Sequence, residues 1–232
     1  MHKLKQQKNQ YSQDLHQNHN FDFIFLGQSV LKYKVPLEVF FTINDMYEKR
    51  RSQLCPANPQ LIGKIENEHS LFFDGQPNNK MKSHRHLPDN VMKWFYEKFK
   101  HYLDWNKVKG YKMHLTSCWV NEMKEHEYNP IHVHQGDLYT GLSSVMILKL
   151  PQQTGVEYSA SDQPMNGKLQ ISGNGAGQFC NTDYIPDTQE RDFYIFPYDV
   201  RHSVNPFNGP DKRRTLSFNC DVDYNPIKNR SA

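Results

Sequence analysis

The chain has 232 residues, of which 37% are hydrophobic and 13% aromatic, and its Lys and Arg exceed its Asp and Glu by 28 to 25. This length and composition are typical of one large globular domain that needs no disulfide to be stable. The mean hydropathy of -0.84 and the absence of any apolar run of about 18 residues exclude a membrane-spanning helix. A net charge of +3 is too small to indicate a nucleic-acid partner.

The cysteines and the first residues indicate the compartment. The four cysteines lie 63, 62 and 40 positions apart and form no C-x-x-C motif, so neither a zinc ribbon nor a disulfide framework is expected. No apolar segment of a secretory signal is present in residues 1–20. We therefore expect a soluble protein of a reducing compartment, the cytoplasm.

Residues 1–20 contain five Gln, three Asn and three His and almost no apolar side chains. This composition predicts a disordered polar tail, because too little apolar surface is available to offset the entropy of ordering. No linker divides the remaining residues, so 21–232 are expected to form a single domain.

Two amphipathic helices are predicted in the first half of that domain, within a helical support of about 36–105. One begins at Pro36, since proline suits the first turn of a helix, and the other begins at Pro88. Apolar and aromatic residues recur at spacings of three and four in both, which places them on one face of each helix: Phe40, Ile43 and Tyr47 in the first, and Val91, Phe95, Phe99 and Tyr102 in the second.

From residue 112 onward the pattern predicts strands, which form a core of about 112–224. Five apolar or alternating segments are bounded by Gly, Pro, Asn or Asp: Met113–Met123, Leu142–Leu150, Lys168–Ser172, Phe193–Phe196 and Arg213–Val222. Helices followed by a run of short strands indicate an α+β protein in which a β-sandwich or barrel is buttressed by helices.

Three histidines and an arginine in the second half are candidates for a site. His132 and His134 are two residues apart, so on a strand both imidazoles would project from one face and could hold one metal ion. His202 follows, and Arg213 comes eleven residues later. On that last strand Arg213 would share a polar face with Thr215, Ser217 and Asn219, while Arg214, Leu216 and Phe218 would share the other face. Arginine suits the bidentate capture of a carboxylate.

This order resembles the iron(II)- and 2-oxoglutarate-dependent oxygenases, and most of all those of bacteria and marine phages that carry H-x-H in place of H-x-D. The resemblance covers about Ser117 to Val222 and is carried by three motifs: Phe196–Pro197 (FP), His202–Pro206 (HSVNP) and Arg213–Asn219 (RRTLSFN). It implies a double-stranded β-helix of the jelly-roll or cupin type, with supporting N-terminal helices.

The resemblance also implies the roles of individual residues. The iron ligands fall on His132, His134 and His202, and 2-oxoglutarate falls on Arg213 and Thr215. Where the wider superfamily has a carboxylate, this chain has His134, and Asp137 remains an alternative second ligand because Gly136 could break the strand and turn Asp137 inward.

The activity implied is that of an oxidoreductase. It is a dioxygenase, expected to be a hydroxylase, that uses Fe²⁺, 2-oxoglutarate and O₂ and yields succinate and carbon dioxide; no particular substrate is implied.

Two other interpretations stay open. One is a cupin-type dioxygenase with three histidines that needs no 2-oxoglutarate, and the other is a β-sandwich binding module with no enzymatic activity. The basic runs Lys49–Arg51 and Lys212–Arg214 lack the aromatic stripe that stacks bases, so nucleic acid is not an expected partner.

Overall fold

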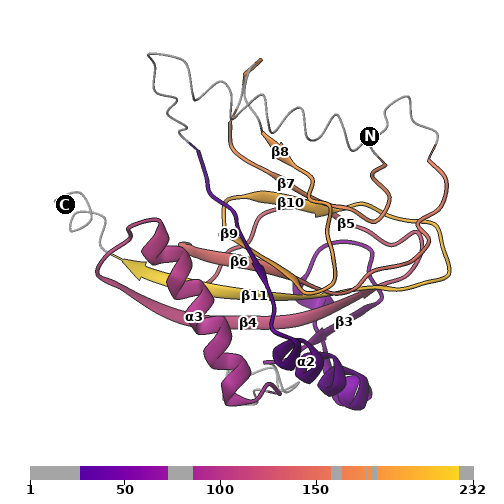
Figure 1. Cartoon of the computed structure of the whole chain (residues 1–232), viewed down its shortest axis with the longest axis horizontal. Coiled ribbons are helices and arrows are strands. Elements are labelled where there is room, and N and C mark those ends of the chain that lie inside the picture. The colour runs from indigo at the N-terminus through magenta and orange to yellow at the C-terminus, as the bar shows by residue number, and fades with distance from the viewer. Residues whose placement is uncertain (1–26, 73–85, 158–163, 176, 179–181, 225–232) are drawn as a thin grey trace.

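The computed structural model describes residues 27–72, 86–157, 164–175, 177–178 and 182–224, which form two antiparallel sheets that face each other (Figure 1). The larger sheet has seven strands in the order β1 (Leu31–Lys34), β9 (Asp192–Pro197), β6 (Gly141–Lys149), β11 (Arg213–Tyr224), β4 (Tyr111–Met123), β3 (Asn67–Ser70) and β2 (Cys55–Pro56). The smaller sheet has four strands in the order β5 (Asn129–His132), β10 (Arg201–Val204), β7 (Leu169–Ser172) and β8 (Asp183–Tyr184).

The chain passes back and forth between the two sheets from β4 onward. Strands β4, β6, β9 and β11 belong to the larger sheet, and β5, β7, β8 and β10 to the smaller one. This alternation is the winding of a double-stranded β-helix, so the predicted α+β fold class and jelly-roll core are confirmed.

Two helices cover the outer face of the larger sheet, as the aromatic stripes predict (Figure 1). Helix α2 (Leu37–Arg50) follows Pro36, and helix α3 (Asp89–Trp105) follows Pro88. The buried ring of Phe95 packs edge-on against Phe193 of β9 and Phe218 of β11, with centroids 5.4 and 4.9 Å apart. The segment between the helices adds two short 3₁₀ helices, at Arg51–Gln53 and Asn58–Gln60, and strands β2 and β3.

Two separate apolar cores lie on the two faces of the larger sheet. The outer core joins α2 and α3 to the sheet and includes Leu216 and Phe218. The inner core lies between the two sheets and includes Val145, Phe196 and Val204. Alternate residues of β11 therefore face the helices or the interior of the β-helix, and this alternation is what places a polar row inside.

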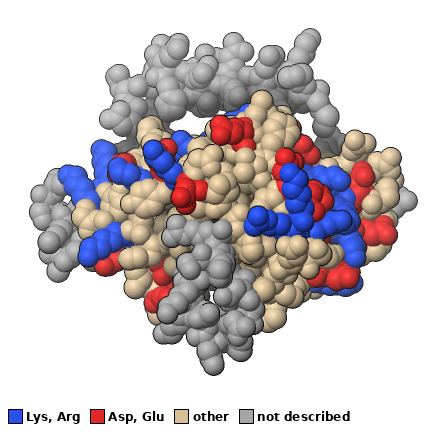
Figure 2. Space-filling view, turned by 90° about the horizontal axis from the view of Figure 1, so that it is seen from below, with Lys and Arg blue, Asp and Glu red and all other residues tan. Residues whose placement is uncertain are grey.

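On the face seen from below, blue and red groups are interspersed mainly toward the two sides, with uncharged groups between them (Figure 2). In the part of the chain that the structure describes, no helix is both long and apolar enough to cross a membrane. The predicted tail, residues 1–20, lies outside the described residues.

Candidate metal centre

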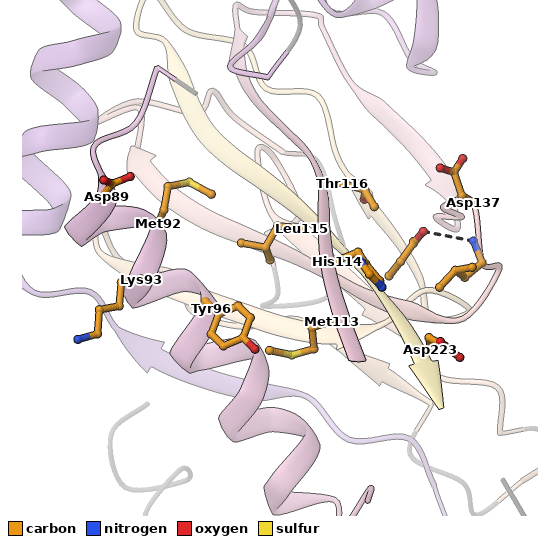
Figure 3. A pocket seen from close by; sticks show the side chains of 12 residues that line it. Asp89, Met92, Lys93, Tyr96, Met113, His114, Leu115, Thr116, Asp137 and Asp223 are labelled. Carbon is orange, nitrogen blue, oxygen red and sulfur yellow. Dashed lines mark hydrogen bonds between the residues drawn. The ribbon is translucent and has the colours of Figure 1, made fainter. Parts of the chain in front are cut away.

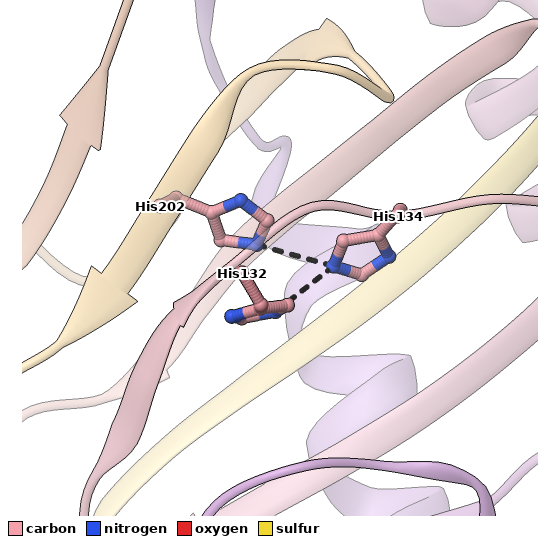
Figure 4. Close-up of side chains that lie close together, drawn as sticks. All are labelled: His132, His134 and His202. Carbon is pink, nitrogen blue, oxygen red and sulfur yellow. Dashed lines mark hydrogen bonds between the residues drawn. The ribbon is translucent and has the colours of Figure 1, made fainter.

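Two short strands and the segment after one of them bring three histidines together (Figure 4). His132 is the last residue of β5 and is paired in register with His202 of β10, so both side chains project from the same face of the smaller sheet. His134 lies two residues beyond the end of β5. Its backbone N–H donates to the carbonyl oxygen of Tyr198 at 3.0 Å, which fixes the chain at that point. The i, i+2 spacing is therefore used as expected, although the strand ends at the first histidine.

The Nε2 atoms of the three rings converge. The Nε2 of His134 is 3.2 Å from that of His132 and 3.1 Å from that of His202. One nitrogen from each residue can be chosen so that all three lie within 4.8 Å of one another. The predicted group His132, His134 and His202 is thus brought to one point.

Each ring holds its other nitrogen, Nδ1, against a hydrogen-bond acceptor. His132 Nδ1 is 2.7 Å from the carbonyl oxygen of Pro130, and His202 Nδ1 is 3.2 Å from that of Val200. His134 Nδ1 is 3.0 Å from Oδ1 of Asn219. A carbonyl oxygen carries no hydrogen, so Nδ1 donates and Nε2 keeps its lone pair. These are the tautomers that a metal ion bound at the centre requires.

Burial keeps the three imidazoles neutral near pH 7. It lowers the pKa of His134 to about 3, with a further contribution from the neighbouring His132. It also lowers the pKa of His202 well below its ordinary value, and the pKa of His132 to a lesser degree. Neutral imidazole is the form that binds a metal ion, so the donor set fits a transition metal such as iron(II).

Asp137, the alternative second ligand, is not part of this group. Its exposed side chain lines a different pocket of about 820 Å³, together with Asp221 and Asp223 (Figure 3). Gly136 is required for a different reason from the one expected, because a Cβ there would lie 1.7 Å from Oδ1 of Asp221. The glycine permits this close approach and does not turn Asp137 toward the histidines.

Arg213 occupies the interior of the β-helix, on the polar side of β11, as strand alternation predicts. It is 1% exposed, and its Nε and Nη2 atoms have no hydrogen-bond partner among the described residues. Burial lowers its pKa to about 10, so the guanidinium is still charged at pH 7. A buried charge without a partner is costly, so this position is suited to an anionic ligand. Thr215, Ser217 and Asn219 are also buried on β11.

Arg214 lies on the opposite side of the strand and is fully engaged. Its Nε donates to Oε2 of Glu122 at 3.0 Å, and its Nη2 bonds both Glu122 and Glu48 of helix α2. The guanidinium carbon also lies 4.6 Å from the ring centroid of Tyr47. The two adjacent arginines therefore have opposite surroundings, and only Arg213 has unpartnered nitrogens.

A pocket of about 400 Å³ opens beside His132 and His134. Among the described residues, its wall contains no Asp, Glu, Lys or Arg and combines amides, hydroxyls and apolar groups, among them Gln60, Ile62, Ser70, Trp119, Asn129 and Gln135. The sequence indicated neither this wall nor the contacts of Trp119 and Asn219 with His134, because both residues are distant from His134 in the chain. Trp119 stacks on the ring of His134, with centroids 5.6 Å apart and planes 19° apart.

Comparison with known proteins agrees with this geometry. Residues 117–219 match the family model described as "Putative 2OG-Fe(II) oxygenase". No curated protein matches the chain.

Three solved structures share the fold. AviO1 from Streptomyces viridochromogenes is 10% identical, with a TM-score of 0.53 over 84% of this chain and 90% of that one. A prolyl-4-hydroxylase from Pseudomonas putida is 14% identical, with a TM-score of 0.51 over 84% and 92%. An oxidoreductase of the 2OG-Fe(II) oxygenase family from Burkholderia pseudomallei is 12% identical, with a TM-score of 0.50 over 83% and 84%.

The family match spans β4 to β11 and contains all three histidines and both arginines described above. It favours an enzyme over a binding module without activity. The cofactors that this family implies are Fe²⁺, 2-oxoglutarate and O₂. Over residues 117–219 the chain is thus similar to the iron(II)- and 2-oxoglutarate-dependent oxygenases.

Proposed function

We propose that this oxygenase is a hydroxylase whose iron(II) is held by His132, His134 and His202. The observation that carries the proposal is the convergence of the three rings, with the Nε2 of His134 3.2 Å from that of His132 and 3.1 Å from that of His202, each ring having its Nδ1 against an acceptor. Three protein ligands on one side leave positions of the metal open for other ligands. Bound iron supplies the activation of dioxygen, with which 2-oxoglutarate is converted to succinate and carbon dioxide as the substrate is hydroxylated.

Arg213 and Thr215 are proposed to hold the distal carboxylate of 2-oxoglutarate. Both are buried on the inward side of β11, and the unpartnered Nε and Nη2 of Arg213 can donate two parallel hydrogen bonds to one carboxylate. This pairing would offset the desolvation of the guanidinium. The same observation favours an enzyme that needs 2-oxoglutarate over a cupin-type enzyme with three histidines that does not.

The substrate is proposed to enter through the uncharged pocket beside His132 and His134. The described residues of the wall offer amide and hydroxyl groups as hydrogen-bond partners but no charge to pair with an ion. An ionised group placed there would lose its hydration without compensation. The part of the substrate that reaches the histidines is therefore expected to be uncharged.

The first test measures bound iron and succinate formation in single variants. His132→Ala, His134→Ala and His202→Ala are each expected to lose iron(II) and 2-oxoglutarate turnover, because each removes one of three ligands. Asp137→Ala should retain iron. His101→Ala is a matched control, since His101 lies on helix α3, where its Nδ1 is 2.8 Å from the hydroxyl oxygen of Tyr33.

Two results would contradict the assignment. If Asp137→Ala loses iron while His134→Ala retains it, the second ligand is the carboxylate. If oxygen consumption by the iron-loaded protein does not depend on 2-oxoglutarate, the cupin-type mechanism is correct and Arg213 has another role.

A further inference from the structure

Asn219 makes a contact that has no counterpart at the other two histidines. His132 and His202 each place Nδ1 against the backbone carbonyl two residues earlier in the chain, Pro130 and Val200. His134 instead places Nδ1 against a side-chain oxygen from a distant strand, 3.0 Å from Oδ1 of Asn219. Among the described residues, only the Nδ1 of His134 meets an acceptor on a side chain, which a point substitution can remove.

This difference follows from where the strand ends. His132 and His202 each belong to a strand of the smaller sheet, and the acceptor at each Nδ1 is a carbonyl of the same stretch of chain. His134 lies beyond β5, and its ring contacts two residues of the larger sheet. Trp119 of β4 stacks on the ring, and Asn219 of β11 meets its Nδ1. The two strands are neighbours, with Trp119 opposite Ser217 and Asn219 opposite Ser117.

The pairing of β4 and β11 is also irregular at this residue. The register shifts between Asn219 and Cys220, which are paired with Ser117 and Leu115, so Thr116 is left without an opposing residue. The hydroxyl of Thr116 donates to the carbonyl oxygen of Asn219 at 3.3 Å. A bulge of this kind changes the direction of the side chains beside it. The irregularity therefore lies where the strand must present an amide to His134.

We propose that Asn219 is a positioning residue of the metal centre. Its Oδ1 accepts the Nδ1–H of His134 and so fixes the tautomer and the ring orientation in which Nε2 faces His132 and His202. This inference rests on the proposed role of His134 as an iron ligand. Strand β11 would then carry both Arg213, which binds 2-oxoglutarate, and Asn219, which orients the iron ligand His134.

The experiment compares two substitutions of Asn219. Asn219→Leu has a similar volume and no acceptor, whereas Asn219→Asp keeps an oxygen that can accept from Nδ1. The matched control is Asn121→Leu, because Asn121 is an equally buried asparagine on β4 (6% against 7% exposed) whose Oδ1 has no hydrogen-bond partner among the described residues. Affinity for iron(II) is measured under anaerobic conditions, and the melting temperature of the metal-free protein reports any general loss of packing.

Asn219→Leu is expected to weaken iron binding about 10- to 100-fold, the usual effect of removing a hydrogen-bond partner of a ligand. Asn219→Asp and Asn121→Leu should stay within about fivefold of the parent. In zinc-loaded protein labelled with ¹⁵N-histidine, the Nδ1–H of His134 should be protected from solvent exchange in the parent and in Asn219→Asp. That protection should be lost in Asn219→Leu.

The outcomes separate this inference from the proposed function. If His134→Ala retains the affinity of the parent for iron, the ligand assignment itself is wrong. If His134→Ala loses iron but Asn219→Leu does not, only the positioning role is wrong. The role is also overturned if Asn219→Asp is as weak as Asn219→Leu, or if zinc-loaded parent protein carries the His134 proton on Nε2.

Discussion

Two adjacent arginines of β11 have opposite surroundings, because they lie on opposite faces of the strand. Arg213 faces the interior of the β-helix with unpartnered nitrogens, and Arg214 faces the helices and is bonded to Glu122 and Glu48. A buried guanidinium without an anion destabilises the folded state, whereas the same group in a satisfied network does not. The cost at Arg213 is therefore expected to be the consequence of a binding function.

Replacing Arg213 by leucine tests this trade between stability and binding. Arg213→Leu should weaken 2-oxoglutarate binding about a hundredfold or more, because charge-assisted hydrogen bonds are worth about 1.5–3 kcal/mol each and about 1.4 kcal/mol corresponds to a factor of ten. Without ligands, the variant should be at least as stable as the parent, since an unpaired buried charge is removed. Calorimetric titration with 2-oxoglutarate and thermal unfolding measure the two effects.

Arg214→Lys is the control for that variant. It should bind 2-oxoglutarate within a few-fold of the parent but unfold at a lower temperature, because a lysine cannot reproduce the bonds to both Glu122 and Glu48. If the two variants exchanged these behaviours, Arg214 would face the ligand and the register of β11 would be wrong by one residue.

Glu68 of β3 provides a pH-dependent test that involves no metal ligand. Its carboxylate is buried with Oε1 unpartnered among the described residues, and burial raises the pKa of Glu68 from 4.5 to about 7, with repulsion from Glu127 adding to the effect. Between these two values the folded state holds a proton that the unfolded state has released. The stability that Glu68 contributes is thus fully present below pH 4.5 and is lost as the pH rises through about 7.

Glu68→Gln is therefore expected to raise stability at pH 8, where the parent must bury a carboxylate, by on the order of 1–3 kcal/mol. At pH 5 the two proteins should differ little. Glu66→Gln serves as a control, because Glu66 is exposed and pairs with Lys124 at the surface. Denaturant unfolding at both pH values gives the comparison, and an equal gain at pH 5 and pH 8 would show that Glu68 is not protonated in the folded protein.

Among the elements, those with a strong period were predictable from the sequence. The stripes of α2 and α3 and the alternation of β11 correctly assigned Phe95 to the outer core and Arg213 to the interior. Strand β3 was not predicted, because its sequence, NEHS, has no apolar residue and its pairing with β4 depends on residues about 50 positions away. Strand β5 was missed for a related reason, since it is four residues long and contains a proline.

The candidate site was predictable only in part for the same physical reason. Local spacing suggested that His132 and His134 could share a metal, and the order of motifs added His202 and Arg213. Contacts made across the interior have no local signal. The interaction of Asn219 with His134 joins residues 85 positions apart, and the bulge that precedes Cys220 depends on how two long strands pair.

At the scale of the whole molecule, the site lies between the two sheets, where the ring of His202 packs on Phe196 of the inner core with centroids 4.8 Å apart. His132 and His202 belong to the smaller sheet, while Asn219 and Arg213 belong to the larger one. A metal ion and 2-oxoglutarate bound here would contact residues of both sheets. Ligands that bind only the folded state stabilise it by about 2.7 kcal/mol at a hundred times their dissociation constant.

We therefore expect zinc, used as a probe in place of iron, to raise the melting temperature by about 5–10 °C at such a concentration, given about 2–4 °C per kcal/mol for a chain of this size. Adding 2-oxoglutarate to the zinc-loaded protein should raise it further. His132→Ala should lose the response to zinc, because it lacks a ligand. Arg213→Leu should keep the response to zinc and lose most of the response to 2-oxoglutarate, since it retains all three histidines. Differential scanning calorimetry measures all five shifts. A parent protein whose unfolding responds to neither ligand would contradict the placement of both sites between the sheets, and an Arg213→Leu variant that still responds fully to 2-oxoglutarate would move the cosubstrate away from β11.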